Sequence, residues 1–367
     1  MKKFLLYTLL LTCLAFSTIV AMPLSPESVS NLRASGHLEE VLERQNRARA
    51  LGIDAPGSNV LEGIRQLHRD NPDEVTLRVL IILVDFEDNE ANNDEFPAEH
   101  FEQLLFSVDE FEPGSMREWY LENTYDEVDL IGDVIGWVRL PETYAYYVNR
   151  NNGNGGWPQN SQRMTYDAVQ LIEDEVDFSI YDNDDNGSVD GIFVVHAGPG
   201  AEQNDGNRDM IWSHAWGLNN HRLQYDGVWI DRYSTEPEDG QIGVFGHEAA
   251  HALFGIPDLY DRGYQSSGLG AWSMMAGGSW GDGGRSPAHF DAWSKLQMGV
   301  IDPQNVNENL YNIEIPAIES EDASYIIWQD GDPGNEYFLI ENRQQIGFDT
   351  SIPGARLIIY HIDDAAR

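Results

Sequence analysis

The order of apolar and polar positions predicts a mixed fold of strands and helices. Residues 78–86 and 191–197 are almost continuously apolar and rich in β-branched side chains, which is typical of strands buried on both faces. Residues 128–140 fit two short strands. Patterns typical of helices occur at residues 99–106, 116–123, 165–176 and 241–254. We therefore predict an α+β fold with a mixed sheet of the α/β type.

The two ends of the chain differ from this central region. Lys2 and Lys3 precede an apolar run and the small residue Ala21, which predicts a signal peptide over residues 1–21, with a signal anchor as the alternative. Residues 22–76 are polar and helix-prone and form a separate leading segment. The main domain is predicted at 77–302. A β-rich segment follows at 303–367, and we expect it to be incomplete because the chain ends soon after its last strand.

The charge balance narrows the classes of partner. Lys and Arg number 22 against 62 Asp and Glu, so the formal net charge is −40. Such a surface repels nucleic acid and anionic membranes, and we expect neither nucleic-acid binding nor stable membrane insertion after signal cleavage. The single cysteine, Cys13, lies inside the predicted signal peptide, so we expect no disulfides and no lipid anchor. The acidic coat serves solubility or binds divalent cations.

The central chemical motif is His247-Glu248-Ala249-Ala250-His251, in an apolar stretch predicted to be helical. Residues four apart lie on one face of a helix, so both imidazoles can bind one metal ion while Glu248 projects toward its water. Zinc suits imidazole ligands, and a catalytic zinc site needs a third protein ligand and an open position. The motif therefore predicts two zinc ligands and a catalytic base.

The third zinc ligand is expected soon after the helix. No Glu occurs between residues 249 and 307, which disfavours the thermolysin-like arrangement. The motif instead continues to Gly255 and Asp258, and Gly255 can adopt the positive φ that ends a helix and turns the chain back. Asp258 is thus the predicted third ligand. In the alternative, Asp258 only caps the turn and His289 binds the metal.

Two further loops carry candidate chemistry. The glycine-rich stretch at 268–280 contains Met274 and Met275, and we expect Met275 to form the hydrophobic base of the metal site, unless both are simply core residues. The other loop spaces its oxygen side chains as calcium loops do, but Phe193 stands where an EF-hand has its Glu. We predict a structural calcium site there, with a hydrated acidic turn as the alternative. Its predicted ligands are Asp182, Asp184, Asn186 and Asp190.

With these motifs in place, residues 78–363 resemble the M6 family of secreted zinc metalloendopeptidases, the immune inhibitor A group of the metzincin clan. The similar stretches are 79–86, 114–120, 136–141, 247–261, 287–295 and 341–344, together with the methionine loop. The resemblance implies a metzincin-like catalytic domain, zinc on His247, His251 and Asp258, Glu248 as the catalytic residue, and Met275 as the Met-turn. It also implies that residues 22–76 are a prosegment.

One position departs from that clan. Some metzincins carry a Tyr two residues after the Met-turn methionine, but Gly277 stands there in this chain. The group that stabilises the oxyanion besides zinc is thus unassigned, with Tyr260, Tyr264 and His289 as candidates. Residues 22–76 contain no cysteine, so a thiolate cannot block the zinc. Asp54 is a candidate blocking carboxylate, and a plain spacer is the alternative.

The resulting hypothesis is a secreted zinc metalloendopeptidase that hydrolyses proteins or peptides, with zinc as the catalytic cofactor and calcium as a structural one. Glu248 would take a proton from water and later deliver it to the leaving amine. A catalytically inactive, calcium-stabilised adhesion or binding protein is the alternative, although such a protein has no physical need for an intact motif. A zinc hydrolase acting on other bonds is the third possibility.

Overall fold

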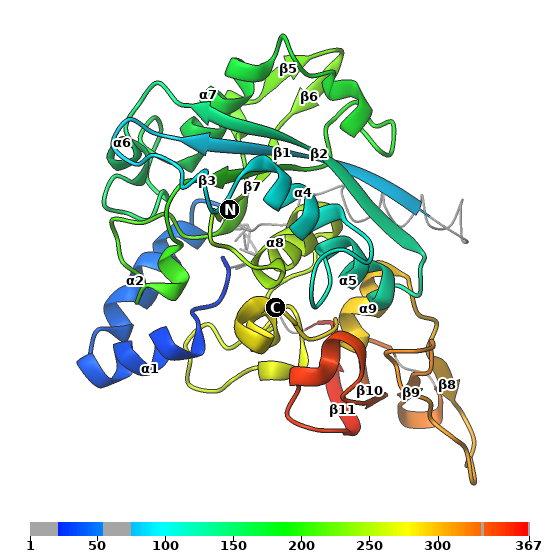
Figure 1. The fold of residues 1–367 in the computed structure, drawn as a ribbon. Coiled ribbons are helices and arrows are strands. Elements are labelled where there is room, and N and C mark those ends of the chain that lie inside the picture. Colours follow the sequence, from blue (N-terminus) through cyan, green and yellow to red (C-terminus); the bar gives the residue numbers. More distant parts are fainter. Residues whose placement is uncertain (1–20, 54–74, 332–333, 366–367) are drawn as a thin grey trace, which may run out of the picture.

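A five-stranded sheet organises the part of the chain that the computed structural model describes, namely residues 21–53, 75–331 and 334–365. Its strand order is β2-β1-β3-β7-β4. The neighbours from β2 to β7 run parallel, whereas β4 lies antiparallel to β7 at the edge. The predicted mixed sheet is confirmed (Figure 1). Its strands are β1 Val75–Asp85, β2 Val128–Arg139, β3 Ile192–His196, β4 His214–Gly217 and β7 Arg232–Pro237.

Strand β1 explains why its sequence is apolar without alternation. Successive side chains of a strand point to opposite faces, and in β1 both faces are covered. Leu77, Val79 and Ile81 belong to the core below the sheet, while Leu80 and Ile82 belong to the core above it. A parallel strand buried in this way has no polar face, so a continuous β-branched run follows from its position.

Strand β2 corrects one prediction. Residues 128–140 were expected to form two short strands, but β2 is a single strand of 12 residues. Ile82 pairs with Ile135, whereas Val84 pairs with Val138, so β2 contains one extra residue at this point. A Cβ on Gly136 would lie 2.3 Å from Leu83 Cβ. The glycine that suggests a break is therefore needed for a bulge within one continuous strand.

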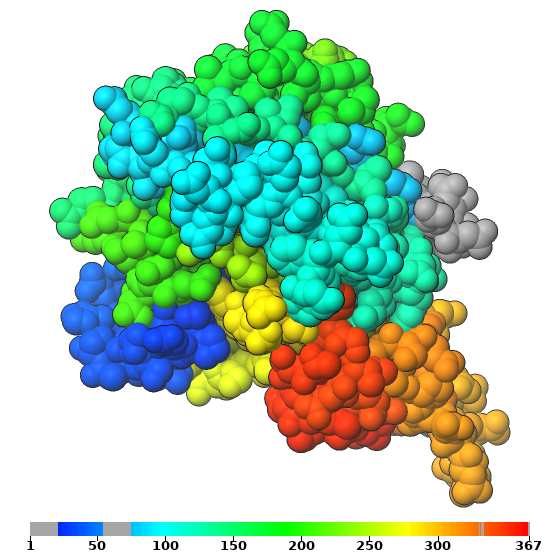
Figure 2. Space-filling model, viewed as in Figure 1, coloured from blue at the N-terminus to red at the C-terminus, as the bar shows by residue number. Residues whose placement is uncertain are grey.

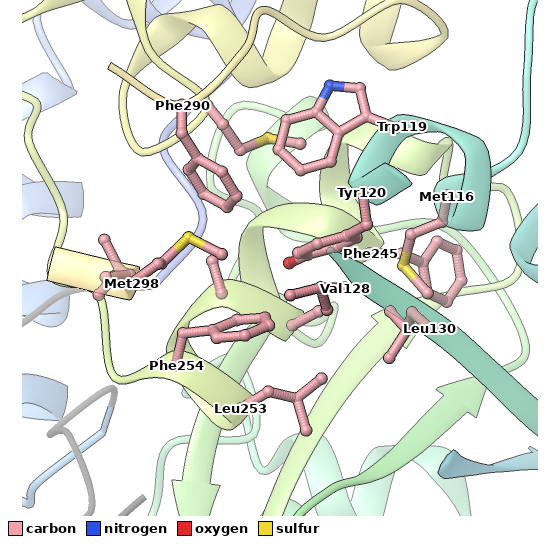
Figure 3. Close-up of a cluster of buried hydrophobic side chains, with 14 of the residues drawn as sticks. Met116, Trp119, Tyr120, Val128, Leu130, Phe245, Leu253, Phe254, Phe290 and Met298 are labelled. Carbon is pink, nitrogen blue, oxygen red and sulfur yellow. The ribbon is translucent and has the colours of Figure 1, made fainter. Parts of the chain in front are cut away.

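The lower face of the sheet packs on helices that bring apolar side chains together from distant parts of the sequence. Met116, Trp119 and Tyr120 of α5 meet Phe245 and other side chains of α8 there (Figure 3). Every residue of α8 is buried, so this helix runs through the interior rather than along the surface. The helices involved are α4 Ala98–Phe106, α5 Met116–Asn123, α8 Ile242–Phe254 and α9 Ala292–Met298.

The upper face is covered by α6 (Tyr144–Val148), α7 (Ser161–Ile172) and the hairpin of β5 (Leu223–Tyr225) and β6 (Val228–Ile230). Helix α7 begins four residues before the predicted start at 165, because the Asn160 side chain accepts a hydrogen bond from Arg163 N and caps the helix there. Short 3₁₀ helices lie at Phe178–Tyr181, Ala201–Gln203, Asn219–His221, Gly270–Trp272, Gly277–Gly284, Gln329–Gly331 and Gly347–Ser351.

The predicted β-rich segment is a second sheet with the order β11-β10-β9-β8. It lies below the first sheet in Figure 1. Its inward side chains Tyr337, Leu339 and Tyr360 belong to the same hydrophobic cluster as Phe245 and Phe290. The predicted boundary at residue 302 therefore does not separate two hydrophobic cores. The strands are β8 Gln304–Val306, β9 Tyr325–Ile327, β10 Glu336–Arg343 and β11 Arg356–Asp363.

The leading segment forms α1 (Pro26–Ser35) and α2 (Leu38–Arg49), as its helix-prone sequence predicts. Ser25 caps α1, and Gly36 ends it with a φ of 76°. The predicted boundary after residue 76 falls inside β1, which begins at Val75. Residues 1–20 of the predicted signal peptide and the candidate Asp54 lie outside the described residues. Among the described helices, none is long and apolar enough to cross a membrane.

Candidate active site

Helix α8 carries His247, Glu248 and His251, and all three side chains are buried below the central sheet. The helix ends at Gly255, whose φ of 62° lies in the left-handed region and whose N–H reaches the carbonyl of His251. That turn reverses the chain and returns Asp258 to the two histidines. The local sequence thus brings the three predicted metal ligands together at the end of one helix.

The distances between the three predicted ligand atoms are close to those between ligands of a single metal ion. His247 Nε2 and His251 Nε2 lie 3.1 Å apart. Asp258 Oδ1 lies 3.0 Å from the first and 3.3 Å from the second. Tetrahedral zinc with ligands at about 2.0 Å holds neighbouring ligand atoms roughly 3.3 Å apart. The three ligand atoms form a triangle of nearly that size.

The outer nitrogens of both rings determine which atoms face the triangle. His247 Nδ1 lies 3.0 Å from the carbonyl oxygen of Met274, and His251 Nδ1 lies 2.6 Å from that of Ile256. A carbonyl can only accept, so each Nδ1 carries the proton and each Nε2 presents a lone pair. Burial lowers the pKa of His251, which also keeps its ring neutral. Two lone pairs and the Asp258 carboxylate then face one another, an arrangement that fits a bound cation.

The methionine loop lies directly against α8. Met274 and Met275 are both fully buried. A Cβ on Gly246 would lie 2.7 Å from Met274 Cε, so the Met274 methyl packs on the helix next to His247. The Met275 carbonyl accepts a hydrogen bond from Leu259 N, which holds the chain just after Asp258. Met274 therefore supports the first histidine, and Met275 supports the segment with the carboxylate.

The alternative ligand His289 lies elsewhere. Its Nε2 is 2.6 Å from Glu122 Oε1 and its Nδ1 is 3.5 Å from Lys295 Nζ. It is not part of the group formed by the two α8 histidines and Asp258. Its carbonyl accepts from Met274 N, so His289 contributes to holding the methionine loop.

The N-terminal segment lies against the residues of this site. The space-filling view shows the blue N-terminal residues against the yellow part of the chain that includes the methionine loop (Figure 2). Met22 N donates to Glu248 Oε1 at 3.1 Å and to the carbonyl of Ser213 at 3.2 Å. Tyr260 donates its hydroxyl hydrogen to the Ala21 carbonyl at 2.6 Å. The peptide bond at the predicted end of the signal peptide thus touches the predicted catalytic base.

Aromatic side chains hold the next residues of this segment. Trp212 Nε1 donates to the Met22 carbonyl at 2.8 Å, and Trp280 Nε1 donates to the Pro23 carbonyl at 3.0 Å. Leu24 N donates to the Tyr264 hydroxyl at 2.8 Å. Sequence reasoning missed Trp212 and Ser213, because no local motif marks the chain just before β4.

The acidic loop brings together three of its four predicted calcium ligands. One carboxylate oxygen each of Asp182, Asp184 and Asp190 lie within 4.8 Å of one another. The backbone N–H of Asn186, the fourth predicted ligand, donates to Asp182 and Asp184. Burial raises the pKa of Asp190 to about 7, and that carboxylate accepts from Asn183 N. Burial also raises the pKa of Asp182, the first residue of the loop.

Comparison with known proteins shows to which family the sequence around this site is similar. A sequence model described as immune inhibitor A peptidase M6, catalytic domain, matches residues 68–300. Immune inhibitor A of Bacillus thuringiensis subsp. alesti is 30% identical over 268 residues, which cover 59% of this chain and 39% of that protein. The pre-pro-metalloprotease PrtV of Vibrio cholerae serotype O1 (strain M66-2) is 30% identical over 271 residues, covering 60% of this chain and 29% of that protein. The matching region spans well under half the length of either relative.

Proposed function

Because the chain belongs to the immune inhibitor A peptidase M6 family and carries its catalytic domain, we propose that it is a secreted, zinc-dependent metalloendopeptidase. The observation that carries this proposal is the triangle of His247 Nε2, His251 Nε2 and Asp258 Oδ1, with Glu248 on the same helix. Proteins or peptides are the expected substrates. Export rests on the signal-peptide pattern of residues 1–21.

The ligand set is that of a catalytic zinc site. Two neutral imidazoles and one carboxylate leave a tetrahedral ion one open position. Bound zinc supplies a Lewis acid that polarises the scissile carbonyl and makes water more acidic. The chain itself holds the three ligands through the Met274, Ile256 and Leu259 backbone contacts, so the metal would bind a largely preformed site.

Glu248 performs the proton transfers in this proposal. Its Oε1 accepts a hydrogen bond from Met22 N at 3.1 Å, so the carboxylate lies within hydrogen-bond reach of an amide nitrogen, as proton transfer to a leaving amine requires. The carboxylate takes a proton from the attacking water and delivers it to that nitrogen. Glu248 is fully buried while residues 21–24 occupy the cleft, so removal of the segment is what opens this carboxylate to water and substrate.

The decisive experiment compares zinc binding with hydrolysis. The segment-free, zinc-loaded protein should cleave casein, lose this activity with a chelator and regain it with added zinc. Glu248→Gln should keep its zinc, measured by mass spectrometry, and lose nearly all hydrolysis, because glutamine cannot accept the water's proton. Glu102→Gln, at an exposed position of α4, is the matched control and should keep full activity.

The possible outcomes separate the hypotheses. A Glu248→Gln variant that retains most activity contradicts the proposed base. A zinc-loaded wild type that cleaves no protein favours the inactive adhesion or binding protein, or a zinc hydrolase acting on other bonds.

Residues 22–76 act as a prosegment in this proposal. The support is the set of hydrogen bonds that place residues 21–24 across the cleft, from Glu248 to Tyr264. A substrate needs the same space, so it cannot enter while the segment is bound. Latency then comes from steric occupation of the cleft by residues 21–24.

A structural calcium ion is part of the same proposal. Asp182, Asp184 and Asp190 support it, because a divalent cation would remove the repulsion among their carboxylates. Calcium chelation with zinc held constant should lower the melting temperature, and Asp182→Asn should lower it similarly while abolishing the calcium response. Asp177→Asn, just outside the loop, is the control. An unchanged melting temperature on chelation would contradict the calcium site.

A further inference from the structure

One peptide bond of this chain is held at both ends by side chains of the cleft. The carbonyl oxygen of Ala21 accepts a hydrogen bond from the Tyr260 hydroxyl at 2.6 Å. The nitrogen of the same bond, Met22 N, donates to Glu248 Oε1 at 3.1 Å and to the Ser213 carbonyl at 3.2 Å. All the side chains involved are buried. In the chain before signal cleavage, the bond between Ala21 and Met22 therefore shows how the cleft holds a peptide unit.

These two ends are the atoms whose charge changes when an amide is hydrolysed. Attack of water puts negative charge on the carbonyl oxygen, and departure of the amine requires a proton on nitrogen. Glu248 already lies at the nitrogen. We infer that Tyr260 is a further catalytic residue, whose hydroxyl binds the carbonyl oxygen of the scissile bond and stabilises its negative charge. This inference rests on the proposed peptidase function and adds a residue to its site.

The step balances with the groups present. The water oxygen bonds to the carbonyl carbon, and the water's proton passes to Glu248. The carbonyl oxygen becomes an oxyanion that accepts a hydrogen bond from Tyr260, and no proton leaves the tyrosine. The carbon–nitrogen bond then breaks while Glu248 returns the proton to nitrogen, leaving a carboxyl group and an amine.

The position of Tyr260 suits this role. It follows Asp258 by two residues, and the Leu259 N–H bond to the Met275 carbonyl fixes the backbone between them. Its ring lies 5.7 Å from that of Tyr264, which limits its movement. Tyr260 also lines the same groove as Gly277, the position at which the sequence lacks a tyrosine after the methionines. A hydroxyl from another loop thus reaches the site that Gly277 leaves without one.

The other two candidates make different contacts. The Tyr264 hydroxyl accepts a hydrogen bond from Leu24 N. Leu24 lies three residues after Ala21, so Tyr264 contacts the peptide away from the bond that corresponds to the scissile one. His289 is engaged with Glu122 and Lys295. Of the three candidates, Tyr260 is the one that touches a carbonyl whose nitrogen meets Glu248.

The test compares Tyr260→Phe with wild type after removal of the N-terminal segment. Both would carry a specific protease site between residues 53 and 75, so that the whole chain folds before it is cut. Loss of an oxyanion donor lowers kcat by about 10² to 10³-fold in other enzymes with little change in KM. A phosphinic peptide, which mimics the tetrahedral oxyanion, should lose affinity by a similar factor in calorimetry. The matching product peptide should lose no more than a few-fold.

Two variants separate catalysis from folding and from substrate binding. Tyr147→Phe removes a buried hydroxyl that bonds to Asp167 on the other side of the sheet, and kcat should stay at the wild-type value. Tyr264→Phe removes a contact made equally in the bound substrate and the transition state, so it should raise KM and leave kcat unchanged.

The outcomes also distinguish this inference from the proposed function. Active Tyr260→Phe within about threefold of wild-type kcat overturns the inference and leaves the peptidase function standing. Equal loss of affinity for the phosphinic and product peptides, or loss of bound zinc, likewise overturns it. If the wild type itself is inactive, the peptidase function fails, and the phosphinic-to-product affinity ratio of the two proteins still decides whether Tyr260 binds the oxygen.

Discussion

Truncation of Met22 to Ala tests how much the Met22 side chain contributes to the affinity of the N-terminal segment for the cleft. The Met22 side chain is fully buried and belongs to one apolar cluster with Trp212, Val244 and Trp280. Val244 lies one turn before His247 on α8, so the Met22 side chain packs on α8 close to the predicted metal ligands. The backbone hydrogen bonds of Met22 do not depend on its side chain, so Met22→Ala removes only apolar contacts.

The expected loss follows from that burial. Removing a buried Met side chain costs about 2–5 kcal/mol in a protein core. Neighbouring side chains can move into part of the space, which favours the lower half of this range, about 2–3 kcal/mol. At about 1.4 kcal/mol per factor of ten, the affinity of the segment should fall roughly 30- to 150-fold.

The assay uses a chain cut at a protease site placed between residues 53 and 75, with the peptide 22–53 added back. Its inhibition constant against hydrolysis, or its dissociation constant by calorimetry, should rise by that factor for Met22→Ala. Leu51→Ala is the control, because Leu51 of the same segment is 50% exposed and should change affinity little. Equal affinities for wild type and Met22→Ala would refute the reasoning that this side chain anchors the segment.

Two further predictions concern buried charges. Burial raises the pKa of Glu202 from 4.5 to about 7, so folding favours its protonated form. This contribution to stability is complete below pH 4.5 and is lost as the pH rises to about 7, so Glu202→Gln should be neutral at acid pH and stabilise by up to about 3 kcal/mol at pH 8 in urea unfolding. An identical difference at both pH values would contradict this. Arg343 is buried between Glu341, Asp349 and a third carboxylate, so Arg343→Met should destabilise by about 3–5 kcal/mol in the same assay. Arg285 forms an exposed ion pair with Asp282, so Arg285→Met should change the free energy of unfolding little. Equal effects of Arg285→Met and Arg343→Met would show that burial of the Arg343 ion pairs is unimportant.

The clustering of the predicted metal ligands His247, His251 and Asp258 could be expected from the sequence because these residues are close together in the chain. His247 and His251 need only the geometry of one helix to face the same point. Gly255 needs only its own freedom at positive φ to turn the chain, and Asp258 follows within three residues. The strands β1 and β3 were equally accessible, since burial on both faces leaves a continuous apolar run.

Strand β2 shows why a prediction from local sequence alone can be wrong. Gly136 has the appearance of a strand break, and only the neighbouring Leu83 shows why a glycine is required within a continuous strand. The same limit applies to the predicted division at residue 302. The alternation of β10 reveals a buried face, but which core receives Tyr337 and Leu339 depends on how the second sheet packs.

The sequence by itself determined the helix with its predicted metal ligands, the buried strands, the acidic loop and the helical character of the leading segment. Each depends on backbone geometry over a few residues, which residue type and spacing record directly. Only the tertiary structure decided that Met22 meets Glu248, 226 positions away, and that Tyr260 reaches the carbonyl of Ala21, 239 positions away. Such contacts leave no periodic signal in the chain, because they arise when separately folded elements pack around a common cleft.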